Sequence, residues 1–277
     1  MFSGATQLKA WIKNRSEQTG ASPNVLLRSY MMERFLERVS LSRYRENIVL
    51  KGGVLIAAMV GIDKRSTMDL DTTIQGLLSN HVEFESIIKE IIGIDACDDV
   101  MFEIHGIKRI HDIGEHDDYR ISLRARFHTI WVDIKIDFTY SDTMIPSEVE
   151  YPYKLMFEDR EIPIMAYNIY TILAEKIETV LSRNVTNTRA RDYYDIYLLL
   201  TLNKDKLSNP EIVHALQTKA NERGSSAYIE EYEKHLADIA ESAEIASIWE
   251  AYCRNYSYAR GIVFSDILSL IANVFEY

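Results

Sequence analysis

Two aspartates separated by a single residue, Asp69 and Asp71, give the clearest chemical signal in the chain. They lie in the segment from Met68 to Ile74, whose pattern predicts a β-strand, so both carboxylates should project from one face while Leu70 faces the core. Two carboxylates held this close repel each other unless a cation binds between them. Mg²⁺ suits the pair, because it takes one or two carboxylates and completes its octahedron with water and phosphate oxygens. The spacing therefore predicts a magnesium site.

A third acid on a neighbouring strand would allow two metal ions to act on the attacking and leaving oxygens of a displacement. Asp137 is the best candidate, because it is the last polar-face residue of the alternating segment 131–138. Asp133 lies on the same face and is the second choice.

A pair of glycines precedes the acidic segment. Gly52 and Gly53 lie between an extended stretch and the apolar run 54–62, which predicts a helix that begins near Gly53 and ends at Gly61. Small residues at a helix start let backbone N–H groups approach phosphate oxygens, and the helix dipole favours negative charge there. Further candidates for phosphate contacts flank the turn and the acidic pair: Lys51, Arg65, Ser66 and Thr67. Each motif alone is common by chance, but in this order they predict a nucleotide-and-metal site.

A second cluster lies farther along the chain. Between Lys176 and Arg191 four cations face one carboxylate, a local charge of +3 in a chain of net charge −11. Lys176 suits a phosphate as a point charge, and arginines suit bidentate phosphate contacts. The alternative is that Lys176 and its neighbours form ion pairs on a helix surface: Glu175, Arg191, Asp192 and Asp195.

The periodicity predicts two N-terminal helices over 8–12 and 25–39, strands over 68–74, 102–110, 119–128 and 131–138, and a helix over 82–92. Pro146, Pro152 and Pro163 predict a crossover, and from Tyr167 onward the pattern is helical. We therefore expect an α/β core with a helical preface over 1–158 and an all-helical domain over 159–277.

Composition narrows the function classes. The 277 residues are 47% hydrophobic, which is typical of a globular protein, and the longest apolar run has nine residues against the roughly 18 of a membrane span. Two distant cysteines exclude a disulfide scaffold, and His105, His111 and His116 lack zinc-ligand spacing. We expect a soluble, cytoplasmic protein. The acidic balance argues against a protein that coats nucleic acid, but not against an enzyme with a local basic site.

Over about residues 5–200 the chain resembles the AbiEii/AbiGii nucleotidyltransferase toxins of bacterial abortive-infection (phage defence) toxin–antitoxin systems. These toxins are related to the DNA polymerase β-type nucleotidyltransferases. The resemblance rests on LKGGVLIAAMVG…RSTMDLD, IDF, LAEKIETVLSR and RARDYYDIYLL. It implies an α+β fold: a polymerase β-like core with a small mixed sheet, N-terminal helices and a helical C-terminal domain. It also implies transfer of nucleotides from an NTP to the 3′ end of tRNA, which blocks aminoacylation and translation.

The resemblance also implies roles for individual residues. Gly52 and Gly53 match the family's glycine turn, and Asp69 and Asp71 match its metal-binding pair. Lys176 matches a lysine that acts near the triphosphate. The last motif of the family is matched by Arg191, Asp192 and Asp195. One of these acids could orient Lys176 or an arginine, and one could assist deprotonation of the attacking 3′-hydroxyl. Val54 stands where the family usually has Ser, Thr or Ala, so backbone donors alone would contact phosphate there.

The resemblance further implies a cognate antitoxin, commonly a winged-helix DNA-binding protein. Two other functions are compatible with the residues. One is nucleotide transfer to a protein or a small molecule, which the net charge of −11 favours over a long RNA contact. The other is nucleotide binding without turnover, for which Val54 is the sequence support.

Overall fold

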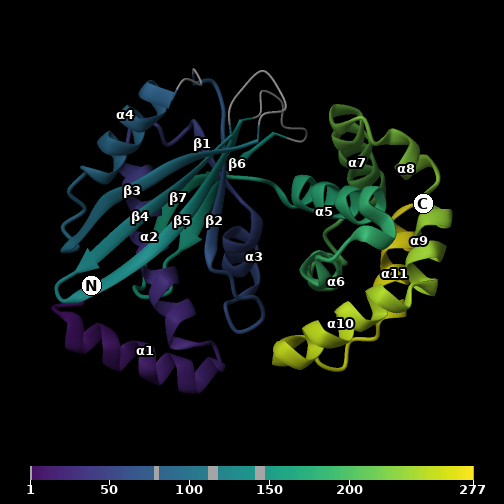
Figure 1. Cartoon of the computed structure of the whole chain (residues 1–277), viewed down its shortest axis with the longest axis horizontal. Helices are drawn as coiled ribbons and strands as arrows, with labels where there is room; N and C mark the ends of the chain where they lie inside the picture. Colours follow the sequence, from purple (N-terminus) through teal and green to yellow (C-terminus); the bar gives the residue numbers. More distant parts are fainter. Residues whose placement is uncertain (1, 78–80, 112–117, 141–146, 277) are drawn as a thin grey trace. The chain divides into compact units, whose positions relative to one another are not determined.

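The structure is a computed structural model of the chain, and it describes residues 2–77, 81–111, 118–140 and 147–276 (Figure 1). Two N-terminal helices, α1 (Ala5–Thr19) and α2 (Pro23–Leu41), confirm the predicted helical preface. Gly20 ends α1 in the left-handed conformation, and its N–H donates to the Ser16 carbonyl. Ser22 caps α2 by accepting a hydrogen bond from the Val25 N–H, so a glycine stop and a serine start separate the two helices.

The strands of the described residues form one mixed sheet in the order β3-β4-β5-β2-β1-β7-β6. Its strands are β1 (Ile48–Lys51), β2 (Asp69–Ile74), β3 (Val100–His111), β4 (Asp118–Phe127), β5 (Ile130–Tyr140), β6 (Val149–Lys154) and β7 (Glu161–Ala166). Two pairs are parallel, β1 with β7 and β2 with β5, and the others are antiparallel. Helix α3 (Gly52–Val60) joins β1 to β2, and α4 (His81–Ile92) follows β2 (Figure 1).

The sheet has one apolar and one polar face. Alternate residues of β4 and β5 are buried, such as Ile121 and Ile136, while the residues between them are partly or fully exposed. Helix α2 packs against β5 and β7 and also contacts α4, so it covers the apolar face. The clean alternation along the predicted strands is confirmed, and the polar face is the one that carries Asp69 and Asp71.

The prolines predicted a crossover, and this prediction was wrong for Pro152 and Pro163, which lie in strands. Residues 149–166 form the β6–β7 hairpin, in which Pro152 lies opposite Pro163. Strand β6 is at the edge of the sheet, where a residue without an N–H is tolerated, and Pro163 precedes the part of β7 that pairs with β1. Pro146 lies outside the described residues.

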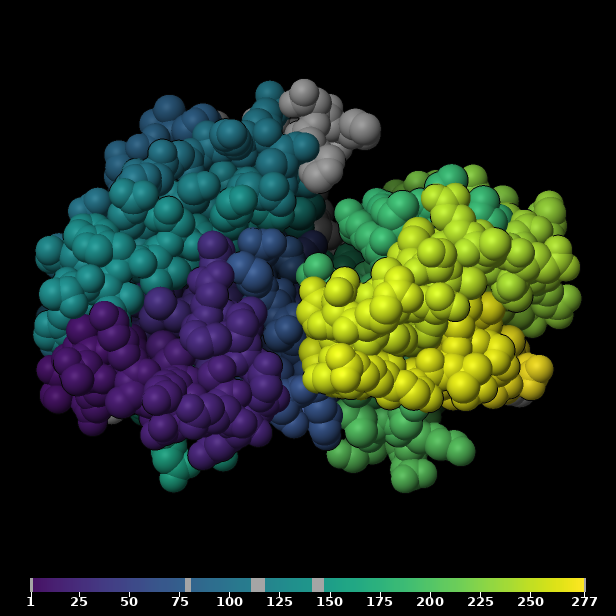
Figure 2. Space-filling view, turned by 60° about the horizontal axis from the view of Figure 1, so that its bottom comes forward, coloured from purple at the N-terminus to yellow at the C-terminus, as the bar shows by residue number. Residues whose placement is uncertain are grey.

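The chain forms two compact units, the first from residues 1–143 and 148–167 and the second mainly from 168–277. The division follows Tyr167, because the β6–β7 hairpin belongs to the sheet; a boundary at 158/159 would separate its two strands. The second unit is all-helical, as predicted. It contains α5 (Ile169–Arg183), α6 (Ala190–Leu202), α7 (Asn209–Arg223), α8 (Ser226–Glu230), α9 (Tyr232–Glu241), α10 (Ala243–Asn255) and α11 (Phe264–Val274). Figure 2 shows α10 and α11, in yellow, on the visible face of this unit. None of the described helices is both long and apolar enough to cross a membrane.

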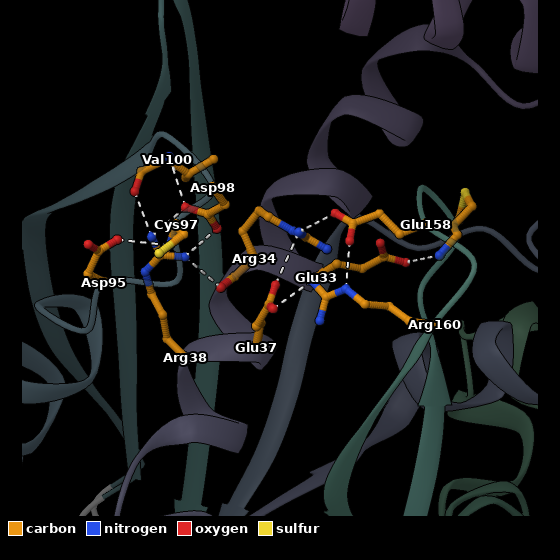
Figure 3. Close-up of polar contacts among 11 residues, drawn as sticks. Glu33, Arg34, Glu37, Arg38, Asp95, Cys97, Asp98, Val100, Glu158 and Arg160 are labelled. Atoms are coloured by element: carbon orange, nitrogen blue, oxygen red, sulfur yellow. Dashed lines mark hydrogen bonds and ion pairs between the residues drawn. The ribbon is translucent and has the colours of Figure 1, made fainter. Parts of the chain in front are cut away.

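Helix α2 carries buried charges that fix it to the sheet (Figure 3). Arg38 donates to both oxygens of Asp98, at 2.7 and 2.8 Å, just before β3. Arg34 donates to Glu158 at 2.8 Å, in the turn between β6 and β7. These side chains are almost fully buried. Removing Arg38 or Asp98 would leave an uncompensated charge in the core, whereas Arg34 also pairs with Glu37 and Glu158 with Arg160.

Glu33, on the same helix, is buried and accepts a hydrogen bond from the Met156 N–H at 2.8 Å. Burial raises the pKa of Glu33 to about 8. The folded protein therefore keeps a proton that the unfolded chain loses near pH 4–5, and wild-type stability should fall as pH rises from about 5 to 8.

We expect Glu33→Gln to remove this loss, because the amide still accepts from Met156 and does not ionise. Urea midpoints between pH 5 and pH 8 measure the effect. Glu85→Gln, at a half-buried glutamate of α4 whose hydrogen bond with Lys89 lowers its pKa, should follow the wild-type profile. Parallel profiles for Glu33→Gln and the wild type would contradict the prediction.

Candidate active site

The turn between β1 and α3 is so closely packed that only glycine fits. Gly52 has a φ of +67°, and a Cβ there would lie 2.2 Å from Oδ2 of Asp71. A Cβ on Gly53 would lie 2.7 Å from Oγ1 of Thr67 and 3.0 Å from a guanidinium nitrogen of Arg65. The predicted glycine turn at the helix start is therefore confirmed, and the structure brings it into contact with the segment that carries the acidic pair.

Strand β2 presents the acidic pair on the polar face of the sheet. Leu70 is fully buried, Asp69 is exposed and Asp71 is half-buried, as the strand pattern predicted. Asp71 lies opposite Lys51 of β1 on one side and opposite Asp137 of β5 on the other. The register thus places three of the predicted residues in one row across three neighbouring strands.

Asp137 lies beside Asp71, but Arg120 of β4 binds it. The guanidinium donates to both oxygens of Asp137, at 2.7 and 2.6 Å. This hydrogen bond raises the pKa of Arg120, and the charges of Asp137, Asp69 and Asp71 add to the effect. Arg120 is therefore the counter-ion of the acidic row. Sequence reasoning missed it, because the alternation places Arg120 on the polar face but does not reveal that it pairs with Asp137.

Within the described ranges, no group of three or more His, Cys, Asp or Glu side chains could hold a metal ion. Asp69 and Asp71 form a two-carboxylate donor set, while the oxygens of Asp137 are bound by Arg120. Such a set fits Mg²⁺ that also takes ligands from water and a triphosphate, because this ion is seldom caged by protein alone. Of the histidines considered for zinc, His116 lies outside the described residues.

The cations predicted near the phosphates have different environments. Arg65 is 1% exposed and donates to the Ser66 carbonyl, so it supports the glycine turn from within. Lys51 donates to Oγ1 of Thr139 at 2.7 Å and lies 5.4 Å from the ring centre of Tyr167.

The second predicted cluster is buried between α5 and α6. Nζ of Lys176 lies 2.5 Å from Oδ1 of Asp192 and 3.1 Å from Oδ2 of Asp195. The side chain of Asp195 is fully buried, that of Asp192 is 7% exposed and that of Lys176 is 19% exposed. Lys176 therefore forms ion pairs, but in a partly buried triad rather than on a helix surface, and both acids hold the same ammonium. Arg191 is exposed in the first turn of α6.

A mixed sheet that places paired aspartates beside a glycine turn, followed by a helical unit, is the architecture of a nucleotidyltransferase. The chain matches the family described as nucleotidyl transferase AbiEii toxins of type IV toxin–antitoxin systems over residues 34–267, which include every predicted site residue. The protein belongs to this family of toxins, and the resemblance stated from the motifs is confirmed.

Two solved structures from Helicobacter pylori are similar in fold. A nucleotidyltransferase has a TM-score of 0.51 and 13% identity, covering 92% of this chain and 94% of its own. JHP933 has a TM-score of 0.50 and 13% identity, covering 91% and 90%. At this identity the likeness supports the fold alone. No curated protein gives a significant sequence match.

The glycine turn yields a matched pair of variants. Gly52→Ala should abolish nucleotide binding, because the new methyl group displaces the Asp71 carboxylate. Gly224→Ala has nearly the same φ, +66°, but nothing lies within 4 Å of its Cβ position. Backbone strain should cost each variant about 1 kcal/mol of stability, and Gly52→Ala should lose more because its methyl group also displaces Asp71. Calorimetric titration with NTP and Mg²⁺ should show the loss for Gly52→Ala alone. Equal binding by the two variants would show that the close packing at Gly52 is not needed.

The triad makes a separate prediction. Lys176→Met leaves two buried carboxylates without their cation, so the free energy of unfolding should fall by roughly 3–5 kcal/mol. Replacing Asp192 and Asp195 with Asn in the same variant removes both charges and should restore most of the loss. Thermal unfolding measures all three proteins. A Tm for Lys176→Met equal to the wild-type value would refute the triad as a structural unit.

Proposed function

We propose that the protein is a Mg²⁺-dependent nucleotidyltransferase toxin that adds nucleotides from an NTP to the 3′ end of tRNA, and so blocks aminoacylation and translation. The observation that carries the proposal is the close approach of the Gly52 backbone to the carboxylate of Asp71. A Cβ on Gly52 would lie 2.2 Å from Oδ2 of Asp71. A turn suited to phosphates and a carboxylate suited to a metal ion are adjacent there.

In the proposed reaction the 3′-oxygen of the acceptor bonds to the α-phosphorus of the NTP. The bond from that phosphorus to the bridging oxygen breaks, pyrophosphate leaves and the hydroxyl proton is released. The backbone at the start of α3 would bind the triphosphate, and Asp69 and Asp71 would hold Mg²⁺. When bound, the ion would neutralise charge on the phosphates and favour the ionised 3′-hydroxyl.

Residues of the helical unit serve the same reaction in this proposal. Lys176 would neutralise charge that develops on the leaving pyrophosphate, and the exposed Arg191 would add a phosphate contact. The resemblance to the family suggests these roles. The two contacts of Lys176 support the orienting role for both Asp192 and Asp195, because each already binds the ammonium.

Val54 is compatible with catalysis. Its side chain is 5% exposed, so this position is engaged in packing, and backbone N–H groups at the start of the helix are the available donors to phosphate. The absence of a hydroxyl at this position is therefore no argument for a protein that only binds nucleotides.

The acceptor and the partner belong to the proposal as well. The net charge of −11 keeps a protein or small-molecule acceptor as the second candidate. Type IV toxin–antitoxin membership implies a cognate antitoxin, and we propose a winged-helix DNA-binding protein for it.

Incubation with radiolabelled NTPs and bulk tRNA tests the proposal. The wild type should label tRNA, and sequencing of the 3′ ends should show added nucleotides. Asp69→Asn should lower the rate at least ~100-fold, because one of two metal ligands is lost, and EDTA should abolish it. Asp159→Asn, at an exposed aspartate between β6 and β7, is the control and should keep the wild-type rate.

Three results would contradict the proposal. They are no labelling by the wild type, equal labelling by Asp69→Asn, and label that follows protease rather than RNase sensitivity in a cell lysate. The last would favour the second candidate acceptor.

A further inference from the structure

The outward side chains of β3, β4 and β5, called here the open sheet face, differ in charge from the rest of the chain. Within the described strands this face carries five cations and four carboxylates, in a chain of net charge −11. The cations are Lys108, Arg120, Arg124, Arg126 and Lys135; the carboxylates are Glu103, Asp118, Asp133 and Asp137. Arg120 and Arg124 are paired with Asp137 and Asp133. Lys108, Arg126 and Lys135 remain against Glu103 and Asp118, so the face has a net charge of +1.

An aromatic side chain lies among the charged side chains of this face. Trp131 of β5 is 52% exposed, although large apolar residues are normally buried. The guanidinium of Arg126, which lies opposite on β4, is 5.5 Å from the Trp131 ring centre. Met101, opposite Arg126 on β3, is 56% exposed and accepts a contact from Arg126 at 3.1 Å. A half-exposed indole backed by an arginine is the arrangement on which unpaired nucleic-acid bases stack.

The open sheet face continues to the acidic pair. Asp69 lies directly opposite Lys135, and Trp131 precedes Lys135 by four residues on the same strand. At about 3.3 Å per residue the indole is about 13 Å from that row, a span that a few nucleotides of single strand can cover. Lys135, opposite Asp69, is exposed, and Asp133, which pairs with Arg124, lies between Trp131 and Lys135 on this face.

We propose that the open sheet face binds the single-stranded 3′ segment of an acceptor RNA, with one base stacked on Trp131 and the backbone phosphates against Arg126 and Lys135. This inference rests on the proposed function, because the attacking 3′-hydroxyl must reach Asp69 and Asp71. The nucleotides that precede the 3′ end must then extend from the acidic pair across the protein surface. The open sheet face offers them cations and a stacking side chain on the same sheet.

Fluorescence anisotropy with a 5′-labelled single-stranded RNA of about 12 nucleotides tests the proposal, with the full chain and without NTP. Trp131→Ala should weaken binding about 10-fold, because one base loses its stacking surface, and Trp131→Phe should keep most of the affinity. Arg126→Ala and Lys135→Ala should each reduce the slope of log K against log salt by about 0.7. A blunt duplex of the same sequence should bind independently of Trp131.

The chain offers a matched control. Arg43, after α2, is 70% exposed and lies 4.9 Å from the ring centre of Tyr44, so it is also an arginine above an aromatic ring. Arg43→Ala should bind RNA like the wild type. Equal RNA affinity for Trp131→Ala, Arg43→Ala and the wild type would overturn the proposal.

A transfer assay separates this inference from the function on which it rests. Trp131→Ala should raise the KM for RNA about 10-fold and leave the KM for NTP unchanged. Transfer to RNA with an unchanged KM in this variant would overturn the inference and leave the function standing. Trp131-dependent RNA binding without any labelled product would support the surface and contradict the function. Transfer to protein that Trp131→Ala does not alter would overturn the surface.

Discussion

The candidate site depends on one contact, between the backbone of Gly52 and the carboxylate of Asp71. The first residue of α3 and the central residue of β2 approach so closely that a methyl group does not fit between them. In the proposed mechanism this contact brings together the backbone donors that would bind phosphate and a carboxylate that would bind a metal ion. Thr67 and Arg65 approach the neighbouring Gly53 equally closely, so the turn packs against the segment that leads into β2.

The order of the strands explains how this contact arises from contiguous chain. Strands β1 and β2 are neighbours and antiparallel, so the end of β1 and the start of β2 lie at the same edge, with α3 closing the connection. The parallel neighbour β5 then adds Asp137 to the row, and β4 adds Arg120. The buried charges of α2 fix the covering helix to both ends of the sheet, near β3 through Arg38 and at the β6–β7 turn through Arg34.

Much of this arrangement was predictable because it is local. The strand that carries Asp69 and Asp71, the glycine turn, the helix that ends at Gly61 and the β4–β5 hairpin each follow from spacing over fewer than a dozen residues. The β6–β7 hairpin was missed, because Pro152 and Pro163 argue against strands wherever the edge position of β6 is unknown. Arg120 was missed for a related reason, since only cross-strand register joins it to Asp137. The family motifs indicated Lys176 and its acids, but their burial as a triad depends on how α5 and α6 pack.

The pairing of Arg120 with Asp137 has a consequence for how the newly made chain folds. If only a metal ion could neutralise this row of carboxylates, folding would depend on the concentration of that ion, as it does in small metal-dependent domains. Here the chain carries its own resident positive group among those acids. We therefore expect the newly made chain to fold without a divalent ion, so that such an ion would serve only the proposed transfer reaction.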